Sequence, residues 1–262
     1  MGDLLFYIVC GTGVGLAIGL TGVGGGSLMT PLLILYGVPT KIAIGTDLLY
    51  ASATKLGALV SHQREQNVNW RTVALLASGS IPASIATSAA FRLAAGDGVD
   101  YTQGLNTALG VMLILTAAVV LFRSRIKQEA ETEAQQNRWY LRHTSVITVI
   151  AGIALGVLVT LSSVGAGAFC AALLLTLFPR VPALKIVGTD VAHAVPLTMV
   201  AGLGHLWNNN VNWSLLAGLL IGSLPAVHFA AKAAKHIPNS VLQKILATML
   251  FFIGAKFAFA SI

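Results

Sequence analysis

Long apolar stretches follow one another along the chain and are separated by short polar ones. The apolar stretches cover residues 4–20, 27–36, 42–61, 70–94, 103–122, 144–161, 165–178, 184–206, 213–235 and 241–260. Most of them approach the roughly 20 residues that a helix needs to cross a bilayer. A backbone in hydrocarbon must satisfy its own hydrogen bonds, and the short alternating strands of a barrel are missing from the pattern. The sequence therefore predicts an all-α polytopic membrane protein.

Two apolar stretches, 27–36 and 165–178, are too short to span a membrane, and each follows a glycine-rich break. The first break is Thr21-Gly22-Val23-Gly24-Gly25-Gly26-Ser27, and the second break is Ser162-Ser163-Val164-Gly165-Ala166-Gly167. Glycine runs of this kind interrupt a helix. We therefore expect 4–36 and 144–178 each to be a hairpin broken inside the membrane.

The chain also contains an internal repeat at one fixed offset. The recurring motifs are Gly45-Thr46-Asp47 with Gly188-Thr189-Asp190, Asn67-Val68-Asn69-Trp70 with Asn210-Val211-Asn212-Trp213, and Gly79-Ser80-Ile81-Pro82 with Gly222-Ser223-Leu224-Pro225. Such self-similarity indicates a duplication. We divide the chain into a first membrane repeat (1–122), a connecting loop (123–143) and a second membrane repeat (144–262). Each repeat has a broken hairpin followed by three transmembrane helices.

Charges suggest how the two repeats are oriented. Loop 62–71 carries two arginines whereas its counterpart 206–212 carries no charge, and loop 92–102 is acidic whereas its counterpart 231–239 is basic. The positive-inside rule then places equivalent loops on opposite faces, which predicts inverted repeats. The basic stretch 123–143 is predicted to be cytoplasmic by the same rule. A parallel duplication with four plain spans per half is the alternative.

Composition excludes several classes of protein. Only 10% of the residues are charged and the mean hydropathy is +0.81, which leaves too little polar surface for a soluble domain. The net charge of +7 lies mostly at segment ends, without a basic cluster interleaved with aromatics, so we expect no nucleic-acid partner. The two cysteines lie in apolar segments and give no disulfide or metal pattern. The first residues lack the positive region of a cleaved signal peptide.

The glycine-rich breaks are the first candidates for chemistry. A half-helix that starts inside the membrane presents free N–H groups and the positive end of its dipole, which together favour an anion. Small residues let an oxyanion approach the backbone, and hydroxyls add donors. The predicted substrate-binding residues are Thr21, Gly22, Gly24, Gly25, Gly26, Ser27, Ser162, Ser163, Gly165, Gly167 and Lys55. The alternatives are that the glycines only allow tight helix packing and that Lys55 extends to the membrane interface.

Ionisable residues inside apolar segments are the second candidates, because they are costly there. Asp47 and Asp190 could carry protons, orient Thr46 and Thr189, or cap backbone groups, and His193 lies one turn after Asp190. We assign these five residues a coupling or structural role. The paired His62 and His205, like the paired Trp70 and Trp213, are expected at the membrane interface.

No residue pattern indicates catalysis. The sequence has no Ser/His/Asp arrangement, no metal-ligand spacing and no phosphate loop in its required context. We therefore expect neither an enzyme nor a cofactor.

The glycine-rich and Gly-Thr-Asp motifs together carry a family resemblance. Leu20-Thr21-Gly22-Val23-Gly24-Gly25-Gly26, followed by Pro31 and Gly45-Thr46-Asp47, resembles the signature of the TauE/SafE family of sulfite exporters and sulfonate permeases. The second half echoes it, but Ser162-Ser163 and Ala166 replace Thr-Gly and Gly. The resemblance implies a bacterial inner-membrane permease with about eight spans, and sulfite, sulfonates or similar small anions as substrates.

We thus predict a secondary transporter that moves a small sulfur oxyanion or organosulfonate by alternating access. A passive anion channel and a proton- or cation-coupled carrier of another small anion are the alternatives. Its partners would be the anion and membrane lipid, and a homodimer is compatible with the uniformly apolar surface.

Overall fold

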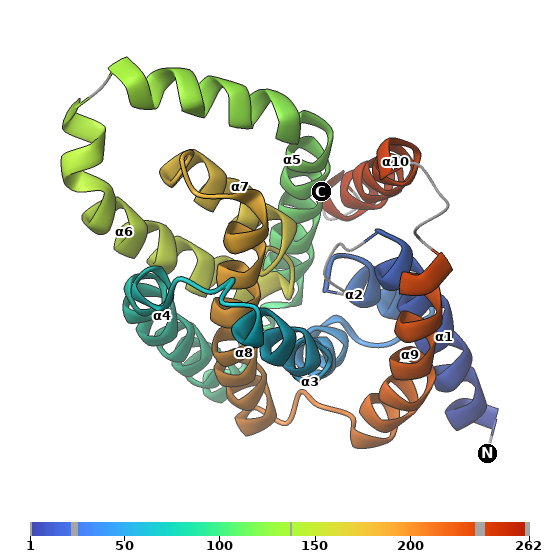
Figure 1. Ribbon diagram of the computed structural model, residues 1–262. Helices are drawn as coiled ribbons and strands as arrows, with labels where there is room; N and C mark the ends of the chain where they lie inside the picture. The colour runs from blue at the N-terminus through green and yellow to red at the C-terminus, as the bar shows by residue number, and fades with distance from the viewer. Residues whose placement is uncertain (1, 22–25, 137, 234–238, 260–262) are drawn as a thin grey trace.

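Ten helices make up the part of the chain that the computed structural model describes, which is residues 2–21, 26–136, 138–233 and 239–259. They are α1 (Gly2–Thr21), α2 (Gly26–Leu35), α3 (Thr40–Arg64), α4 (Trp70–Gly96), α5 (Thr102–Gln136), α6 (Arg138–Ser162), α7 (Ala168–Leu177), α8 (Ala183–Trp207), α9 (Trp213–Ala233) and α10 (Asn239–Phe259). Figure 1 shows them as one helical assembly. The predicted all-α class is confirmed.

Membrane-spanning capacity is clearest in four of the described helical segments. Residues 70–96, 102–122, 143–162 and 183–207 are long and apolar enough to cross a bilayer, and residues 4–17, 168–177 and 213–227 form shorter apolar helices. The helices α2 and α7 have ten residues each. At about 1.5 Å rise per residue, ten residues reach about half of the hydrocarbon thickness. Both stretches predicted to be too short for a span are therefore half-length helices.

The helices α3 and α8 lie side by side and run in opposite directions. Gly45, near the start of α3, faces His205 near the end of α8, and a Cβ at this glycine would overlap that side chain. Seven residues further along α3, the Ser52 hydroxyl donates a 3.2 Å hydrogen bond to the carbonyl oxygen of Val195, further back in α8. The start of α3 and the end of α8 are therefore at the same end of the assembly.

Close glycine contacts join α1 to α9 and α4 to α6, and both pairs run parallel. Gly11 and Gly15 of α1 lie against Leu219 and Ser223 of α9, as Gly152 and Gly156 of α6 lie against Leu76 and Ser80 of α4. Figure 1 shows the first pair on the right and the second on the left. Small residues allow this approach, because helices in lipid associate by packing rather than by the hydrophobic effect.

These directions place the start of α1 at the same end as the start of α3. The end of α8 lies beside the start of α3, and α9 begins a few residues later, at Trp213. Because α1 runs parallel to α9, it begins at this end too. By the same reasoning α6, parallel to α4, begins at the opposite end, where α8 also begins.

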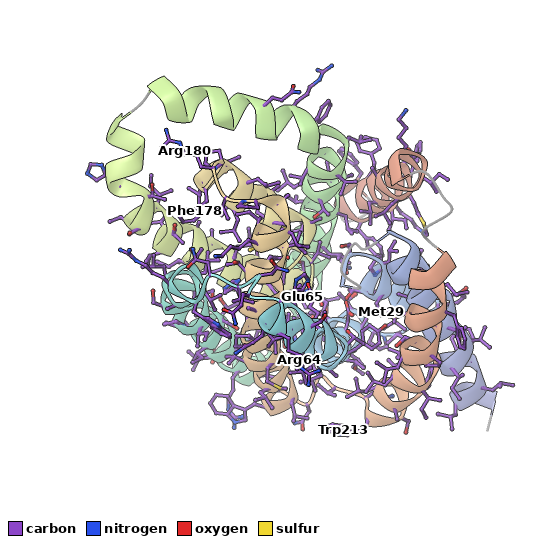
Figure 2. All side chains as sticks on the ribbon, viewed as in Figure 1. Met29, Arg64, Glu65, Phe178, Arg180 and Trp213 are labelled. Atoms are coloured by element: carbon purple, nitrogen blue, oxygen red, sulfur yellow. The ribbon has the colours of Figure 1, made fainter. Side chains whose placement is uncertain are left out.

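Two asparagines explain why α4 and α9 start where they do. The side-chain oxygen of Asn69 accepts a 3.3 Å hydrogen bond from Thr72 N, and that of Asn212 accepts a 3.0 Å hydrogen bond from Leu215 N. Both satisfy amide groups that a helix start leaves free. The following Trp70 and Trp213 are exposed by 51% and 60%, as expected for interface anchors; Trp213 lies at the lower edge in Figure 2.

The connection between the halves, predicted to be a loop over 123–143, is helical in its described part. The helix α5 continues to Gln136 and α6 begins at Arg138, so helix covers both sides of residue 137. Figure 1 shows this part of α5 as an arm that extends beyond the other helices. The polar stretch 125–136 is rich in Glu, Gln and Ala, which are strong helix formers. The stretch 123–143 thus lies between the candidate spans 102–122 and 143–162 and is helical on both sides of residue 137, whereas its cytoplasmic location stays a prediction.

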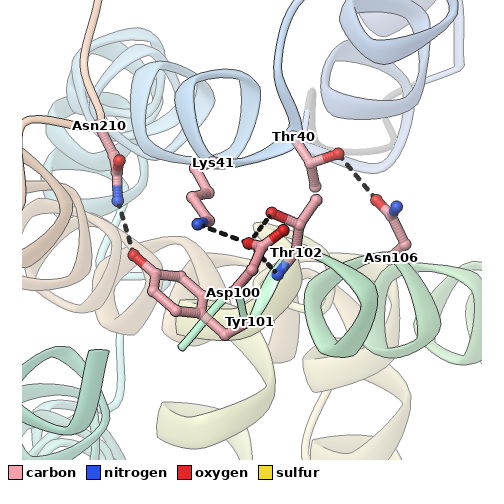
Figure 3. A network of polar contacts seen from close by, with 7 residues as sticks. All are labelled: Thr40, Lys41, Asp100, Tyr101, Thr102, Asn106 and Asn210. Carbon is pink, nitrogen blue, oxygen red and sulfur yellow. Dashed lines mark hydrogen bonds and ion pairs between the residues drawn. The ribbon is translucent and has the colours of Figure 1, made fainter. Parts of the chain in front are cut away.

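A polar network ties helix ends together at the end of the assembly where α3 begins (Figure 3). Lys41 of α3 forms a 2.8 Å ion pair with Asp100, and its ammonium lies 4.1 Å from the ring centre of Tyr101. The hydroxyl of Tyr101 accepts a 3.3 Å hydrogen bond from the amide of Asn210, which follows α8. The network therefore links the start of α3 to the α4–α5 and α8–α9 connections.

Candidate functional site

The Gly-Thr-Asp motif of α3 packs against the turn that precedes α9, and the same motif of α8 packs against the turn that precedes α4. A Cβ at Gly45 would overlap the carbonyl oxygen of Asn210, and one at Gly188 would overlap that of Asn67. The threonine hydroxyls then accept hydrogen bonds from these turns. The donor to Thr46 is the amide of Asn212, at 3.1 Å, and the donor to Thr189 is that of Asn69, at 3.0 Å. Of the two roles left open for the threonines, the contacts support the structural one.

Asp47 is fully buried at a junction of three segments. Its Oδ2 atom accepts a 2.6 Å hydrogen bond from the hydroxyl of Thr30 on α2 and a 2.9 Å hydrogen bond from the hydroxyl of Ser163 in the second break. Its Oδ1 atom is also buried, and the described residues offer it no hydrogen-bond donor. Asp47 thus joins α2 and α3 to the second break, which lies far away in the sequence.

The second break has a defined backbone geometry. After α6 ends at Ser162, Ser163 adopts φ 59° and Gly165 φ 115°, both in the left-handed region. The hydroxyl of Ser162 donates a 2.7 Å hydrogen bond to Leu158 O and accepts a 3.1 Å hydrogen bond from Val164 N. Of the two serines predicted to bind substrate, Ser162 therefore holds the local backbone, whereas Ser163 reaches Asp47.

The start of α7 has no side-chain cap. Its N-cap residue, Gly167, has no side chain that could accept from the first amides of the helix. The amides of Cys170 and Ala171 bond to the carbonyl oxygens of Gly165 and Gly167, but those of Ala168 and Phe169 have no such partner within the described structure. Free amides and a positive dipole end are the features that attract anions to helix starts.

Lys55 of α3 brings a positive charge to this point. Its ammonium donates a hydrogen bond to the carbonyl oxygen of Ala166 in the second break. It also interacts electrostatically with the carboxylates of Asp190 and Asp47. The helix α3 continues to Arg64, so it does not end before Lys55, and the position of Lys55 relative to the membrane interface stays a prediction. Lys55 lies inside the assembly and remains partly exposed.

A second polar cluster surrounds His193 on α8. Its Nε2 atom lies 2.8 Å from the hydroxyl of Ser80 on α4, and its Nδ1 atom lies 3.9 Å from the sulfur of Cys170 on α7. His193 and Asp190 are 1% and 4% exposed. The described residues contain no group of three or more His, Cys, Asp and Glu side chains arranged to hold a metal ion.

The first break lies mostly outside the described residues. Gly22, Gly24 and Gly25 lie outside the described residues, and Thr21 and Gly26 are described only as the end of α1 and the start of α2. Ser27 is buried with 6% exposure. The predicted role of the first break in substrate binding stays a prediction.

His205 corrects one expectation. Its side chain is fully buried, and its Nε2–H donates a 2.9 Å hydrogen bond to the carbonyl oxygen of Thr160. It also packs edge-to-face against Phe91, with ring centres 5.5 Å apart. His205 therefore lies in the protein interior and not at the membrane interface.

Sequence reasoning missed three residues of the site: Thr30, Ser80 and Cys170. Each is a small polar or sulfur-containing residue inside an apolar helix. Signals were present for two of them, since Thr30 precedes Pro31 in a helix too short to span and Ser80 lies in the repeated Gly-Ser-x-Pro motif.

Comparisons with known proteins give the family of this chain. The family model described as "Sulfite exporter TauE/SafE" matches residues 7–257. The chain belongs to the TauE/SafE family. The probable membrane transporter protein YjnA of Bacillus subtilis (strain 168) is 36% identical over 252 residues, which cover 95% of this chain and 97% of the relative.

More distant relatives extend the similarity. The probable membrane transporter protein YdhB of the same organism is 29% identical over 234 residues, covering 89% of this chain and 91% of the relative. A probable membrane transporter protein of Methanocaldococcus jannaschii is 24% identical over 264 residues, covering 94% and 91%. No solved structure matches the chain. This TauE/SafE protein is thus a multi-pass membrane protein of a transporter family.

Proposed function

We propose that this protein is a secondary transporter for a small sulfur oxyanion or an organosulfonate, such as sulfite or a short sulfonate, in the bacterial inner membrane. The observation that carries the proposal is the position of Lys55 at the second break, beside the uncapped start of α7. A fixed cation and free amides are complementary to an oxyanion. The name of the matching family, which refers to sulfite export, supports the same class of substrate.

We further propose that the two halves are inverted repeats. The contact between Gly45 and Asn210 has an equivalent at the repeat offset, between Gly188 and Asn67. The equivalent helices α3 and α8 run in opposite directions. A two-fold operation that exchanges antiparallel helices has its axis perpendicular to them, which for transmembrane helices is an axis in the membrane plane. These contacts support inversion over the parallel duplication.

In this arrangement the broken segments α1–α2 and α6–α7 would enter the membrane from opposite faces. Each segment would then return to the face from which it entered. The starts of α1 and α3 share one end of the assembly and those of α6 and α8 the other, as such hairpins require. Substrate would bind where the half-helices end, near the middle of the membrane. Movement of one half against the other would open the site to one side at a time.

Ligand binding to the purified protein in detergent tests the substrate class. A ligand that binds the folded state raises the unfolding temperature with the logarithm of its concentration. We expect a rise with sulfite or a short sulfonate, and a weaker rise with carboxylates of equal charge. Lys55→Met should lose the rise, whereas Lys244→Met, at an exposed lysine of α10, should keep it. An anion effect that survives Lys55→Met would contradict this site.

Transport in liposomes then separates a carrier from a channel. An alternating-access carrier can exchange labelled for unlabelled substrate across the membrane, and its flux saturates because each transport cycle passes through a binding site. We expect accelerated counterflow. Flux that stays proportional to concentration, without counterflow, would favour the passive channel.

A further inference from the structure

We propose that Asp47, Thr30 and Ser163 bind a sodium ion whose gradient drives the transporter. The coupling role rests on the proposed function, whereas the ion site itself does not.

The oxygen atoms around Asp47 match the ligands of a hard cation. Three segments bring a carboxylate and two hydroxyls together, with both hydroxyls within 3 Å of Oδ2, at 2.6 and 2.9 Å. A hydroxyl that donates one hydrogen bond keeps lone pairs for a cation. Carboxylates and neutral oxygens such as hydroxyls are the ligand atoms that hard cations select.

The Oδ1 atom of Asp47 is buried without a hydrogen-bond partner among the described residues. Asp47 is 0% exposed, and within the described structure this oxygen receives no hydrogen bond. A buried polar atom without a partner carries an uncompensated desolvation cost. A bound cation would satisfy Oδ1. A proton on Oδ1 is the competing occupant, and the pH arm of the test below separates it from a cation.

The second break lies between the C-terminal end of α6, which favours a cation, and the N-terminal end of α7, which favours an anion. Ser163 directly follows the last residue of α6, where the helix dipole is negative. Lys55 contacts Ala166, close to the start of α7, where the dipole is positive. In transporters with broken helices, the C-terminal ends of half-helices hold sodium ions and the N-terminal ends hold anionic substrate groups. The position of Asp47 at the α6 end therefore favours a cation.

Charge balance favours a monovalent ion. The ammonium of Lys55 interacts with both Asp190 and Asp47. If all three are ionised, they sum to one negative charge inside the membrane, where net charge is costly. One sodium ion neutralises this charge, whereas a divalent ion would leave an excess.

The test uses the complete chain in detergent without any anionic substrate. Sodium chloride replaces choline chloride at constant ionic strength, and the unfolding temperature is followed. We expect a rise with the logarithm of sodium concentration, and a weaker one with potassium. Thr30→Val and Ser163→Gly should each raise the apparent Kd for sodium at least about tenfold, since each removes one ligand of the site.

Two features keep the variants interpretable. Glycine fits the φ of 59° at position 163, so Ser163→Gly removes the hydroxyl without straining the backbone. Thr116→Val is the matched control, because Thr116 of α5 is 1% exposed and its hydroxyl has no partner among the described residues. This control should bind sodium as the wild type does.

Three outcomes would overturn the sodium site. They are equal effects of sodium, potassium and choline, an unchanged sodium affinity in both variants, and stabilisation by low pH without a sodium effect, which would assign Asp47 to a proton. The sulfite or sulfonate response, measured separately, decides the proposed function. A protein that binds the anion but not sodium refutes only the ion site.

Discussion

The hydroxyl of Ser163 donates a 2.9 Å hydrogen bond to the Oδ2 atom of Asp47, across 116 residues of sequence. Asp47 belongs to the first predicted repeat and Ser163 to the second. The bond therefore crosses between the two halves, and it does so at a carboxylate buried inside the membrane protein. Any movement of one half against the other must stretch, break or replace it.

The coupling between these two residues should be measurable. A double-mutant cycle with Asp47→Asn and Ser163→Gly is expected to give an interaction energy of about 1–2 kcal/mol, because a hydrogen bond to a buried carboxylate is worth more than a neutral one. Unfolding in mixed micelles of increasing SDS content measures it. Asp47→Asn combined with Thr116→Val should be additive, and equal coupling in both cycles would deny a specific bond.

Gly45 should be intolerant of any side chain. Gly45→Ala places a methyl group against the carbonyl oxygen of Asn210 and the Cβ of His205, so we expect a loss of about 1–3 kcal/mol or more from overpacking. Gly13 of α1 has no neighbouring atom within 4 Å of the position that a Cβ would take. Gly13→Ala should therefore stabilise α1 by about 0.5–1 kcal/mol. The same SDS titration compares the two, and similar effects would contradict the packing between α3 and α8.

Equivalent turns should face opposite sides of the membrane. Gln66 and Asn209 occupy equivalent repeat positions, share a φ of 58° and are both exposed. In a chain whose Cys10 and Cys170 are replaced by alanine, an impermeant thiol reagent should label only one of Gln66→Cys and Asn209→Cys in intact cells. Permeabilised cells provide the control, in which both should react. Labelling of both variants from outside would refute inverted repeats.

The ion pair of Asp100 should make stability depend on acid pH. The hydrogen bonds from Lys41 and Thr102 lower the pKa of Asp100 to about 2, below the value of about 3.9 expected in an unfolded chain. A carboxyl group with a lowered pKa stabilises the fold above the unfolded pKa, and this contribution disappears as the pH falls through the folded value. Unfolding temperatures between pH 5 and pH 2 should therefore fall more for the wild type than for Asp100→Asn.

The size of this effect should be small, because Asp100 is exposed and solvent screens its ion pair. Asp97→Asn serves as control, since Asp97 is similarly exposed and takes part in no ion pair among the residues described. If Asp97→Asn flattened the pH dependence as much as Asp100→Asn, the Lys41 pair would not be its cause.

Several features could be predicted from the sequence because they depend on local chemistry. Apolar stretches of span length require helices in lipid, and glycine runs interrupt them, so the all-α class and the half-length α2 and α7 were predicted. The helical form of the polar stretch 123–136 was not predicted, although its Glu, Gln and Ala residues favour a helix.

The sequence by itself determined that this chain is a helical membrane protein of the TauE/SafE family, and which polar residues lie in apolar segments. Only the tertiary structure decided which of them meet. It brings Ser163 to Asp47 and Lys55 to the second break, and it buries His205. The physical reason is that hydropathy depends on each residue alone, whereas hydrogen bonds depend on which helices pack together. In a membrane, lipid-facing and protein-facing surfaces are equally apolar, so the packing leaves no trace in the hydrophobic pattern.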